Sequence, residues 1–203
     1  MLYQLSYGPG ARQGATQGPG TQEGAAIDWA VARLHIGGKV AAPDWIVVDT
    51  QPGPAGDLVA SCTALCFADG SMAEIYASHV YEHLGYQEAL PRALAEAFRV
   101  LIPGGVLRLS VPDLDTLARL FVEPERPLAE KFLLMRMMFG GQMDRFDFHQ
   151  VGLNWDFARA FLARAGFAAV ERVEDHGLFD DASRVEVGGV PISLNLVARK
   201  PPA

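Results

Sequence analysis

Residues 73–112 carry a strand, a helix and a second strand in direct succession. Residues 73–78 (AEIYAS) are a β-prone run, and the segment 86–101 places Leu90, Leu94, Phe98 and Leu101 at helical spacing. Pro103-Gly104-Gly105 is predicted to end that helix and to begin the alternating strand VLRLSVP at 106–112. Alternation of this kind indicates a sheet covered by helices rather than an all-α or all-β protein.

The flanking segments continue the alternation in both directions. Strands are predicted at 31–38, 45–50 and 57–61 on the amino-terminal side, and helices at 113–121 and 127–139 on the carboxyl-terminal side. Asn154 is a predicted N-cap for a helix that closes at Gly166, and strands at 167–173 and 192–199 follow. The sequence therefore predicts a three-layer α/β domain over 26–203, with a mostly parallel sheet and an antiparallel edge strand.

The first 25 residues differ in composition from the rest. GPGARQGA at 8–15 recurs as GPGTQEGA at 18–25, and glycine, proline and glutamine dominate both copies. We predict a flexible tail here because almost nothing in the segment can be buried. A lid that orders over a ligand is the alternative.

The bulk properties narrow the class of protein. A length of 203 residues fits one domain with a full core, and a net charge of −7 disfavours binding to nucleic acid. The start of the chain lacks the pattern of a secretory signal, and no apolar stretch approaches the ~20 residues that cross a bilayer. We expect a soluble, cytoplasmic protein whose two cysteines, Cys62 and Cys66, are reduced thiols.

Residues 79–83 read H-x-x-E-H, the spacing of an inverted zinc-peptidase signature. That chemistry needs His79 and His83 one turn apart on a continuous helix, whereas the preceding run is β-prone and Gly85 discourages helix propagation. No acidic third ligand has an obvious context downstream. The sequence therefore predicts no metal site, and Glu82 and His83 are expected to cap the next helix or to pair with each other.

Several ordered motifs resemble the Rossmann-like, S-adenosylmethionine-dependent methyltransferases. EIYASHVYEHL and AFRVLIPGGVLRLSVPD, within 74–113, are similar to the central part of that family. LHIGG followed by DWIVVDT is similar to the first two strands of a compact branch, and LVASCTALCFADGS to its third strand and turn. HQVGLNWDFARAFLARAGFAAVERV is similar to the late helix and the strand beyond it. The resemblance covers about 33–200.

The resemblance implies a cofactor site for S-adenosylmethionine at the carboxyl ends of the strands. Gly37 and Gly38 would form the turn beside the cofactor, and Asp49 would accept hydrogen bonds from the ribose hydroxyls. Lys39 stands where the family has a second spaced glycine; it would pair with the methionine carboxylate or partly block the pocket. The 12 residues from Gly37 to Asp49 are too few for a nicotinamide-dependent dehydrogenase.

The third strand and the strand at 73–78 complete the implied site. Ser61 stands where the family has an aspartate for the adenine amino group, with Cys62 beside it. Ser78 and His79 would also contact the cofactor, and His79 is a candidate base for the acceptor or a residue that seals the pocket. His149 is a second candidate for acceptor contact.

The later helices are predicted to provide a pocket wall or a subunit interface and not catalytic residues. Met135, Met137 and Met138 suit an adaptable pocket wall, a subunit contact in a homodimer, or plain core. The expected function is methyl transfer to an unidentified small-molecule acceptor. The competing interpretation is a methyltransferase-fold protein that has lost cofactor binding and serves as a scaffold or ligand-binding partner, which Lys39 and Ser61 favour.

Overall fold

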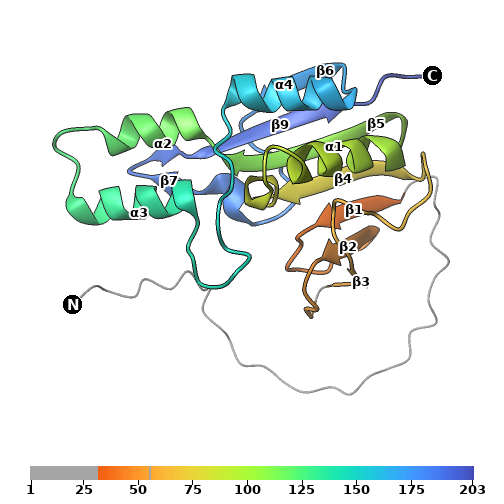
Figure 1. Cartoon of the computed structure of the whole chain (residues 1–203), viewed down its shortest axis with the longest axis horizontal. Coiled ribbons are helices and arrows are strands. Elements are labelled where there is room, and N and C mark those ends of the chain that lie inside the picture. Colours follow the sequence, from red (N-terminus) through yellow and green to blue (C-terminus); the bar gives the residue numbers. More distant parts are fainter. Residues whose placement is uncertain (1–31, 55) are drawn as a thin grey trace.

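A computed structural model describes residues 32–54 and 56–203, so the predicted tail at 1–25 lies outside the described residues (Figure 1). A seven-stranded sheet runs through the molecule in the order β3-β2-β1-β4-β5-β9-β6, and a separate two-stranded hairpin is formed by β7 and β8. The strands are β1 (Arg33–Ile36), β2 (Trp45–Asp49), β3 (Leu58–Val59), β4 (Met72–Ser78), β5 (Leu101–Pro112), β6 (Ala169–Val173), β7 (Glu186–Val187), β8 (Val190–Pro191) and β9 (Ser193–Arg199).

Helices follow the strands at nearly the predicted positions. They are α1 (Ala89–Val100), α2 (Leu114–Phe121), α3 (Leu128–Phe139) and α4 (Trp155–Ala165), with two short 3₁₀ helices, η1 (Tyr81–His83) and η2 (Ala182–Arg184). The Asn154 side chain accepts a hydrogen bond from the Phe157 amide, and Gly166 adopts a left-handed conformation after α4. Both predicted ends of this helix are therefore confirmed. Among the described residues, no helix combines the length and the apolar character that crossing a membrane requires.

The sheet is mostly parallel, as predicted. Strands β1 to β5 pair in parallel, whereas β9 runs antiparallel to both β5 and β6. The antiparallel strand therefore lies one place in from the edge, and β6 forms the edge itself. The expected α/β architecture is confirmed, with this difference in the position of the antiparallel strand.

One face of the sheet packs against α1 and α4 (Figure 1). Leu34 and Ile75 from the strands, Leu90 and Leu94 from α1, and Leu162 from α4 belong to one buried cluster. The strand residues alternate between faces, so the apolar ones on this side meet the apolar stripe of each helix. This cluster is the main core.

The opposite face of the sheet is covered by the segment 174–185. His35 of β1 and Tyr76 of β4 point to this side, where their rings lie 4.2 Å and 5.1 Å from the ring of Phe179. The Tyr76 hydroxyl donates to Asp181 at 2.7 Å. The short connection between β1 and β2 leaves no room for a helix, so the third layer of the described fold is formed here by an irregular segment.

The region around 103–105 differs from the expected turn. Strand β5 begins at Leu101, directly after α1, and Pro103-Gly104-Gly105 lies inside it, beside an irregularity in its pairing with β4. Gly104 has φ +79°, and a Cβ on Gly105 would lie 2.8 Å from the Ile102 carbonyl oxygen. The glycines therefore permit a local distortion of the strand, which then regains register at Val106.

Helices α2 and α3 and the β7–β8 hairpin form an extension beyond the carboxyl ends of the strands (Figure 1). A second buried cluster holds the extension together, and it is separate from the main core. Its buried members are Leu117, Leu120, Leu134, Val187 and Ile192. The hairpin and both 3₁₀ helices are absent from the sequence prediction because each is too short to show a periodic pattern.

Candidate functional site

The turn after β1 is set by glycine. Gly37 has φ +73°, its amide donates to the Val48 carbonyl at 2.8 Å, and an added Cβ would lie 2.6 Å from Cγ2 of Val80. A side chain here would be strained and would clash with the segment after β4. The predicted requirement for glycine is thus explained by a backbone turn and a close contact between two strand ends.

Asp49 ends β2 at the same edge of the sheet and forms an ion pair with Lys39. The Lys39 Nζ lies 2.6 Å from Oδ2 of Asp49, while Oδ1 accepts a hydrogen bond from the Gln51 amide at 3.0 Å. Burial alone would raise the pKa of Asp49, but the bonds from Lys39 and Gln51 outweigh it and bring the pKa below its ordinary value. The carboxylate is therefore ionised, and Lys39 contacts the carboxylate that the resemblance assigns to ribose.

A polar cleft of about 360 Å³ opens at this edge and gathers most of the predicted cofactor residues. One side comes from the strand ends and the segment 79–84, and the other comes from the loop that leads out of α3. The predicted cofactor residues that line it are Gly37, Lys39, Asp49, Ser61, Cys62 and His79. Side chains distant in sequence thus converge on one cavity, as expected for the carboxyl edge of a parallel sheet.

Gly38 and Ser78 are not among the residues that line this cleft. A Cβ on Gly38 would lie 2.7 Å from Nδ1 of His35, so this glycine makes room for the imidazole on the opposite face. The Ser78 hydroxyl donates to Oδ1 of Asp181 at 3.1 Å on that same face. Strand alternation explains the result, because Ser78 shares a face with Tyr76 and not with the cleft.

Ser61 and Cys62 differ in how they meet the cleft. The Ser61 hydroxyl lies 2.8 Å from that of Thr63 and accepts a bond from the Thr63 amide at 3.2 Å, which forms a local turn. Cys62 is buried, and burial raises the pKa of its thiol to about 11. Cys62 is thus an inert, apolar part of the wall, whereas Ser61 offers a hydroxyl.

His79 lies at the junction of two cavities. Its backbone has φ +53°, which is uncommon for a residue with a side chain, and its Nε2 lies 3.0 Å from the Ser193 hydroxyl. Besides the polar cleft, His79 lines a second cavity of about 170 Å³ that is mainly apolar. The other lining residues of this apolar cavity are Pro112, Leu133, Arg136, Met137, Gly141, His149, Ala182, Val185 and Ile192.

The carboxylate of Glu82 is buried between the histidines of this region. Its Oε1 lies 3.3 Å from Nδ1 of His79 and 4.0 Å from Nε2 of His149. Burial alone would raise the pKa of Glu82, but the neighbouring His79, with His83 and His149, brings the pKa below its ordinary value. Burial lowers the pKa of His149. Glu82 pairs with His79 and His149 and does not cap the next helix, so the expected pair with His83 is replaced by a cluster in which His83 lies close by.

Sequence reasoning did not assign the residues of the late loop to the cofactor cleft. Asp144, Arg145, Phe146, Asp147 and Gln150 of this loop also line the polar cleft. Their backbone is anchored to η1, since the Gln150 amide donates to the Glu82 carbonyl at 2.8 Å and its side chain donates to the His83 carbonyl at 2.9 Å. No periodic pattern marks a loop of this kind, although its acidic and aromatic composition was visible in the sequence.

Comparison with known protein families agrees with the resemblance of the motifs to methyltransferases. The family described as Methyltransferase domain matches residues 28–109, which include β1 to β4, α1 and most of β5. The sequence has no match among the curated proteins compared with it.

Solved structures share the fold at low sequence identity. A possible histamine N-methyltransferase from Thermotoga maritima has 16% identity and a TM-score of 0.52, over 83% of this chain and 82% of its own. The 1,6-didemethyltoxoflavin-N1-methyltransferase of Burkholderia thailandensis, solved with S-adenosylhomocysteine, has 15% identity and a TM-score of 0.53, over 84% of this chain and 72% of its own.

A third structure is longer than this chain. A protein from Bordetella parapertussis described as possibly exported has 13% identity and a TM-score of 0.52, over 87% of this chain. The match spans only 65% of the Bordetella protein's length. The match over 28–109 agrees with the resemblance of the motifs, and the strand order and these shared folds show the Rossmann-like fold of the class I methyltransferases, as predicted.

Proposed function

We propose that the protein is an S-adenosylmethionine-dependent methyltransferase that binds its cofactor in the polar cleft. The residues fit such a ligand in three respects: a glycine turn at Gly37, an ionised carboxylate at Asp49 and a hydroxyl at Ser61, all lining one cavity. Asp49 would accept hydrogen bonds from the ribose hydroxyls, and Ser61 would face the adenine. When bound, the cofactor supplies a methyl group activated by a sulfonium.

The observation that carries the proposal is the position of His79 in the walls of both cavities. The apolar cavity would hold the acceptor, with Met137 as part of its wall and His149 at its rim. The imidazole of His79 would accept, at Nδ1, the proton that a hydroxyl or amine acceptor loses, because Nε2 contacts the Ser193 hydroxyl at 3.0 Å.

Calorimetric titration with S-adenosylhomocysteine tests cofactor binding. We expect micromolar affinity for the unaltered protein and a loss of about 10- to 100-fold in Asp49→Asn, because a hydrogen bond to a charged group contributes about 1.5–3 kcal/mol. Asp69→Asn is the matched control, since that side chain is 81% exposed and pairs with Arg99. It should bind as the unaltered protein does. Equal affinity in Asp49→Asn would remove Asp49 from the site.

The ion pair between Lys39 and Asp49 favours a second candidate function. A carboxylate already paired at 2.6 Å competes with ribose, which is what a fold that has lost its cofactor would show. Such a protein would act as a scaffold or a ligand-binding partner. Absence of heat at millimolar S-adenosylhomocysteine would support this candidate and contradict the enzyme.

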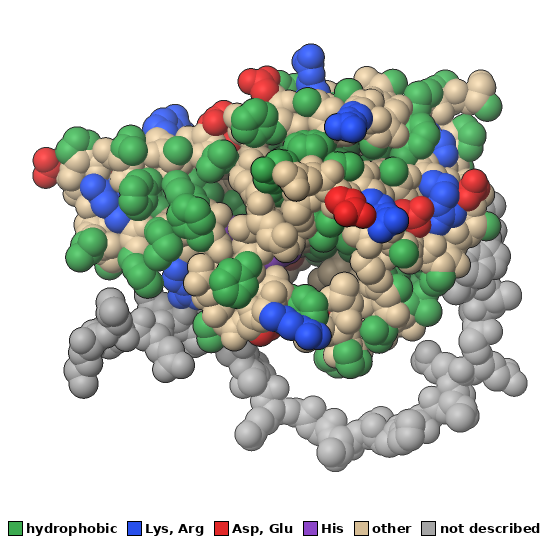
Figure 2. Space-filling model, in the orientation of Figure 1, with side chains coloured by type: hydrophobic (Ala, Val, Ile, Leu, Met, Phe, Trp, Pro, Cys, Tyr) green, Lys and Arg blue, Asp and Glu red, His purple; other side chains and the backbone are tan. Residues whose placement is uncertain are grey.

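A homodimer through α3 is a further part of the proposal. Figure 2 shows hydrophobic side chains gathered over the end of the molecule that carries α2 and α3. Leu128, Phe132 and Phe139 of α3 are exposed at 84%, 47% and 56%, which is typical of a contact surface. Light scattering after size exclusion should give a dimer mass. A monomer mass at all concentrations would contradict the dimer and leave the methyltransferase proposal unaffected.

A further inference from the structure

Glu82 carries a buried carboxylate without a well-aligned hydrogen bond. The side chain is 2% exposed, its Oε1 lies 3.3 Å from Nδ1 of His79, and within the described part of the chain neither carboxylate oxygen has a partner at hydrogen-bond geometry. An ionised group buried in this way is costly unless a positive charge or a metal compensates it. The main-chain oxygen of Glu82, in contrast, accepts from the Gln150 amide at 2.8 Å.

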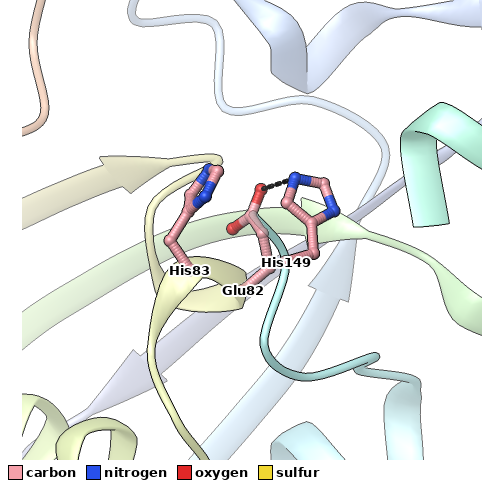
Figure 3. A group of neighbouring side chains, drawn as sticks. All are labelled: Glu82, His83 and His149. Carbon is pink, nitrogen blue, oxygen red and sulfur yellow. Dashed lines mark ion pairs between the residues drawn. The ribbon is translucent and has the colours of Figure 1, made fainter. Parts of the chain in front are cut away.

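Two imidazoles flank this carboxylate (Figure 3). The carboxylate points into the space between the rings of His83 and His149, whose centroids are 4.7 Å apart. One donor atom from each of the three residues lies within 4.8 Å of the other two. His83 comes from η1 and His149 from the loop after α3, so the fold brings together two segments far apart in sequence.

Backbone contacts hold the His83 ring and the loop that carries His149. The His83 Nδ1 lies 3.2 Å from the Phe148 carbonyl, which leaves Nε2 with a free lone pair. The His149 amide donates to the Phe139 carbonyl at 3.2 Å and holds its loop against the end of α3. A ring nitrogen held by a carbonyl is the usual support for a metal-binding histidine.

We propose that Glu82, His83 and His149 bind a divalent transition-metal ion of the zinc class. Two imidazoles and one carboxylate suit such an ion, whereas calcium and magnesium prefer oxygen ligands. Bond lengths of about 2.0–2.2 Å would require only a small inward rotation of side chains whose donors are within 4.8 Å. Three protein ligands leave a coordination position open.

This ligand set differs from the peptidase signature in the sequence. That signature places both histidines of H-x-x-E-H on one helix with the glutamate as base, whereas His79 precedes η1 with φ +53°. In the proposed site the glutamate is itself a ligand, and the second imidazole comes from His149. His83 also lines the polar cleft and His149 the apolar cavity, but the test is independent of cofactor binding because it uses zinc alone.

Zinc titration of the full chain tests the proposal. The protein is treated with a chelator, exchanged into buffer and titrated by calorimetry with zinc alone, without S-adenosylmethionine. We expect one ion per chain with micromolar or tighter affinity. His83→Gln, at a half-buried position, and Glu82→Gln, which keeps the side-chain shape, should each weaken binding at least about tenfold.

Cys66→Ser is the control, because Cys66 carries an exposed thiol, a group that can bind zinc, outside the proposed ligand set. It should bind zinc as the unaltered protein does, and circular dichroism should show every variant folded. Absence of zinc binding, unchanged affinity in a folded His83→Gln, or loss of binding in Cys66→Ser would each overturn the proposal. A negative zinc result with intact binding of S-adenosylhomocysteine would refute the metal site alone.

Discussion

The two cavities that meet at His79 are built in different ways. The polar cleft lies at the ends of β1, β2 and β4, where a glycine turn and a carboxylate follow directly from the strands. The apolar cavity is formed by α3, the end of β5 and the segment that leads into the hairpin, over a small core of its own. The polar cleft therefore depends on strand ends in the main sheet, and we call this region the sheet side. The apolar cavity depends on the extension, which has its own packing, and we call this region the extension side.

Truncation of Leu134 should produce the largest difference in local stability between the extension and the main sheet. Leu134 is fully buried in the second cluster, and Leu134→Ala should cost about 3 kcal/mol in the stability of the extension. Amide hydrogen exchange in α2 and α3 should accelerate on the order of 100-fold, while β1 and β4 keep their protection.

Leu90→Ala is the matched control for that experiment. Leu90 is buried to the same degree in the main core, so its truncation should accelerate exchange in α1 and the sheet. If Leu134→Ala accelerates exchange equally in both regions, the extension does not unfold separately and the comparison fails.

His35 should make the sheet side sensitive to acid. Burial lowers the pKa of His35 from 6.5 to about 4, against a smaller raising effect of Asp181. Between pH 6.5 and pH 4, His35 is protonated in the unfolded chain but not in the folded chain. The free energy of unfolding therefore falls as the pH drops from 6.5 towards 4, by at most about 3 kcal/mol. In His35→Leu that part of the decline should disappear, as measured by urea unfolding at several pH values. An unchanged decline would assign the acid sensitivity to other groups.

The sheet side was predictable from the sequence because its signals are local. A β-branched run that ends in an acid, as at Val47 to Asp49, and a strand that ends in glycine each predict both an element and its functional end. Six of the eight predicted cofactor residues line the cleft. The other two, Gly38 and Ser78, lie near the cleft in sequence but face the segment that covers the opposite side of the sheet.

The extension side was not predictable in the same way. The helix at α3 was predicted, and the interpretation of Met137 as a pocket wall left other roles open. Val185 and Ile192 reach the apolar cavity only because η2 and the short hairpin turn the chain back, and no residue pattern marks those contacts. The ion pair between Lys39 and Asp49 likewise depends on the geometry of the turn after β1, which the pattern of apolar residues does not specify.

Substitution of Lys39 should have the smallest effect, and it tests which group Lys39 pairs with when the polar cleft is occupied. Its side chain is 80% exposed, and pairs of this kind contribute about 0.2–1 kcal/mol. Lys39→Gln would free one oxygen of Asp49, so S-adenosylhomocysteine should bind about threefold more tightly in calorimetry. A clear weakening would instead show that Lys39 pairs with the carboxylate of the ligand.

A crystal structure of the protein with S-adenosylhomocysteine tests the central claim most directly. We expect the ribose hydroxyls to bond to Asp49, the adenine to lie near Ser61, and the sulfur to lie beside His79, facing the apolar cavity. An adenosyl group bound elsewhere, or a sulfur separated from His79 by protein side chains, would contradict the claim that methyl transfer takes place where the two cavities meet.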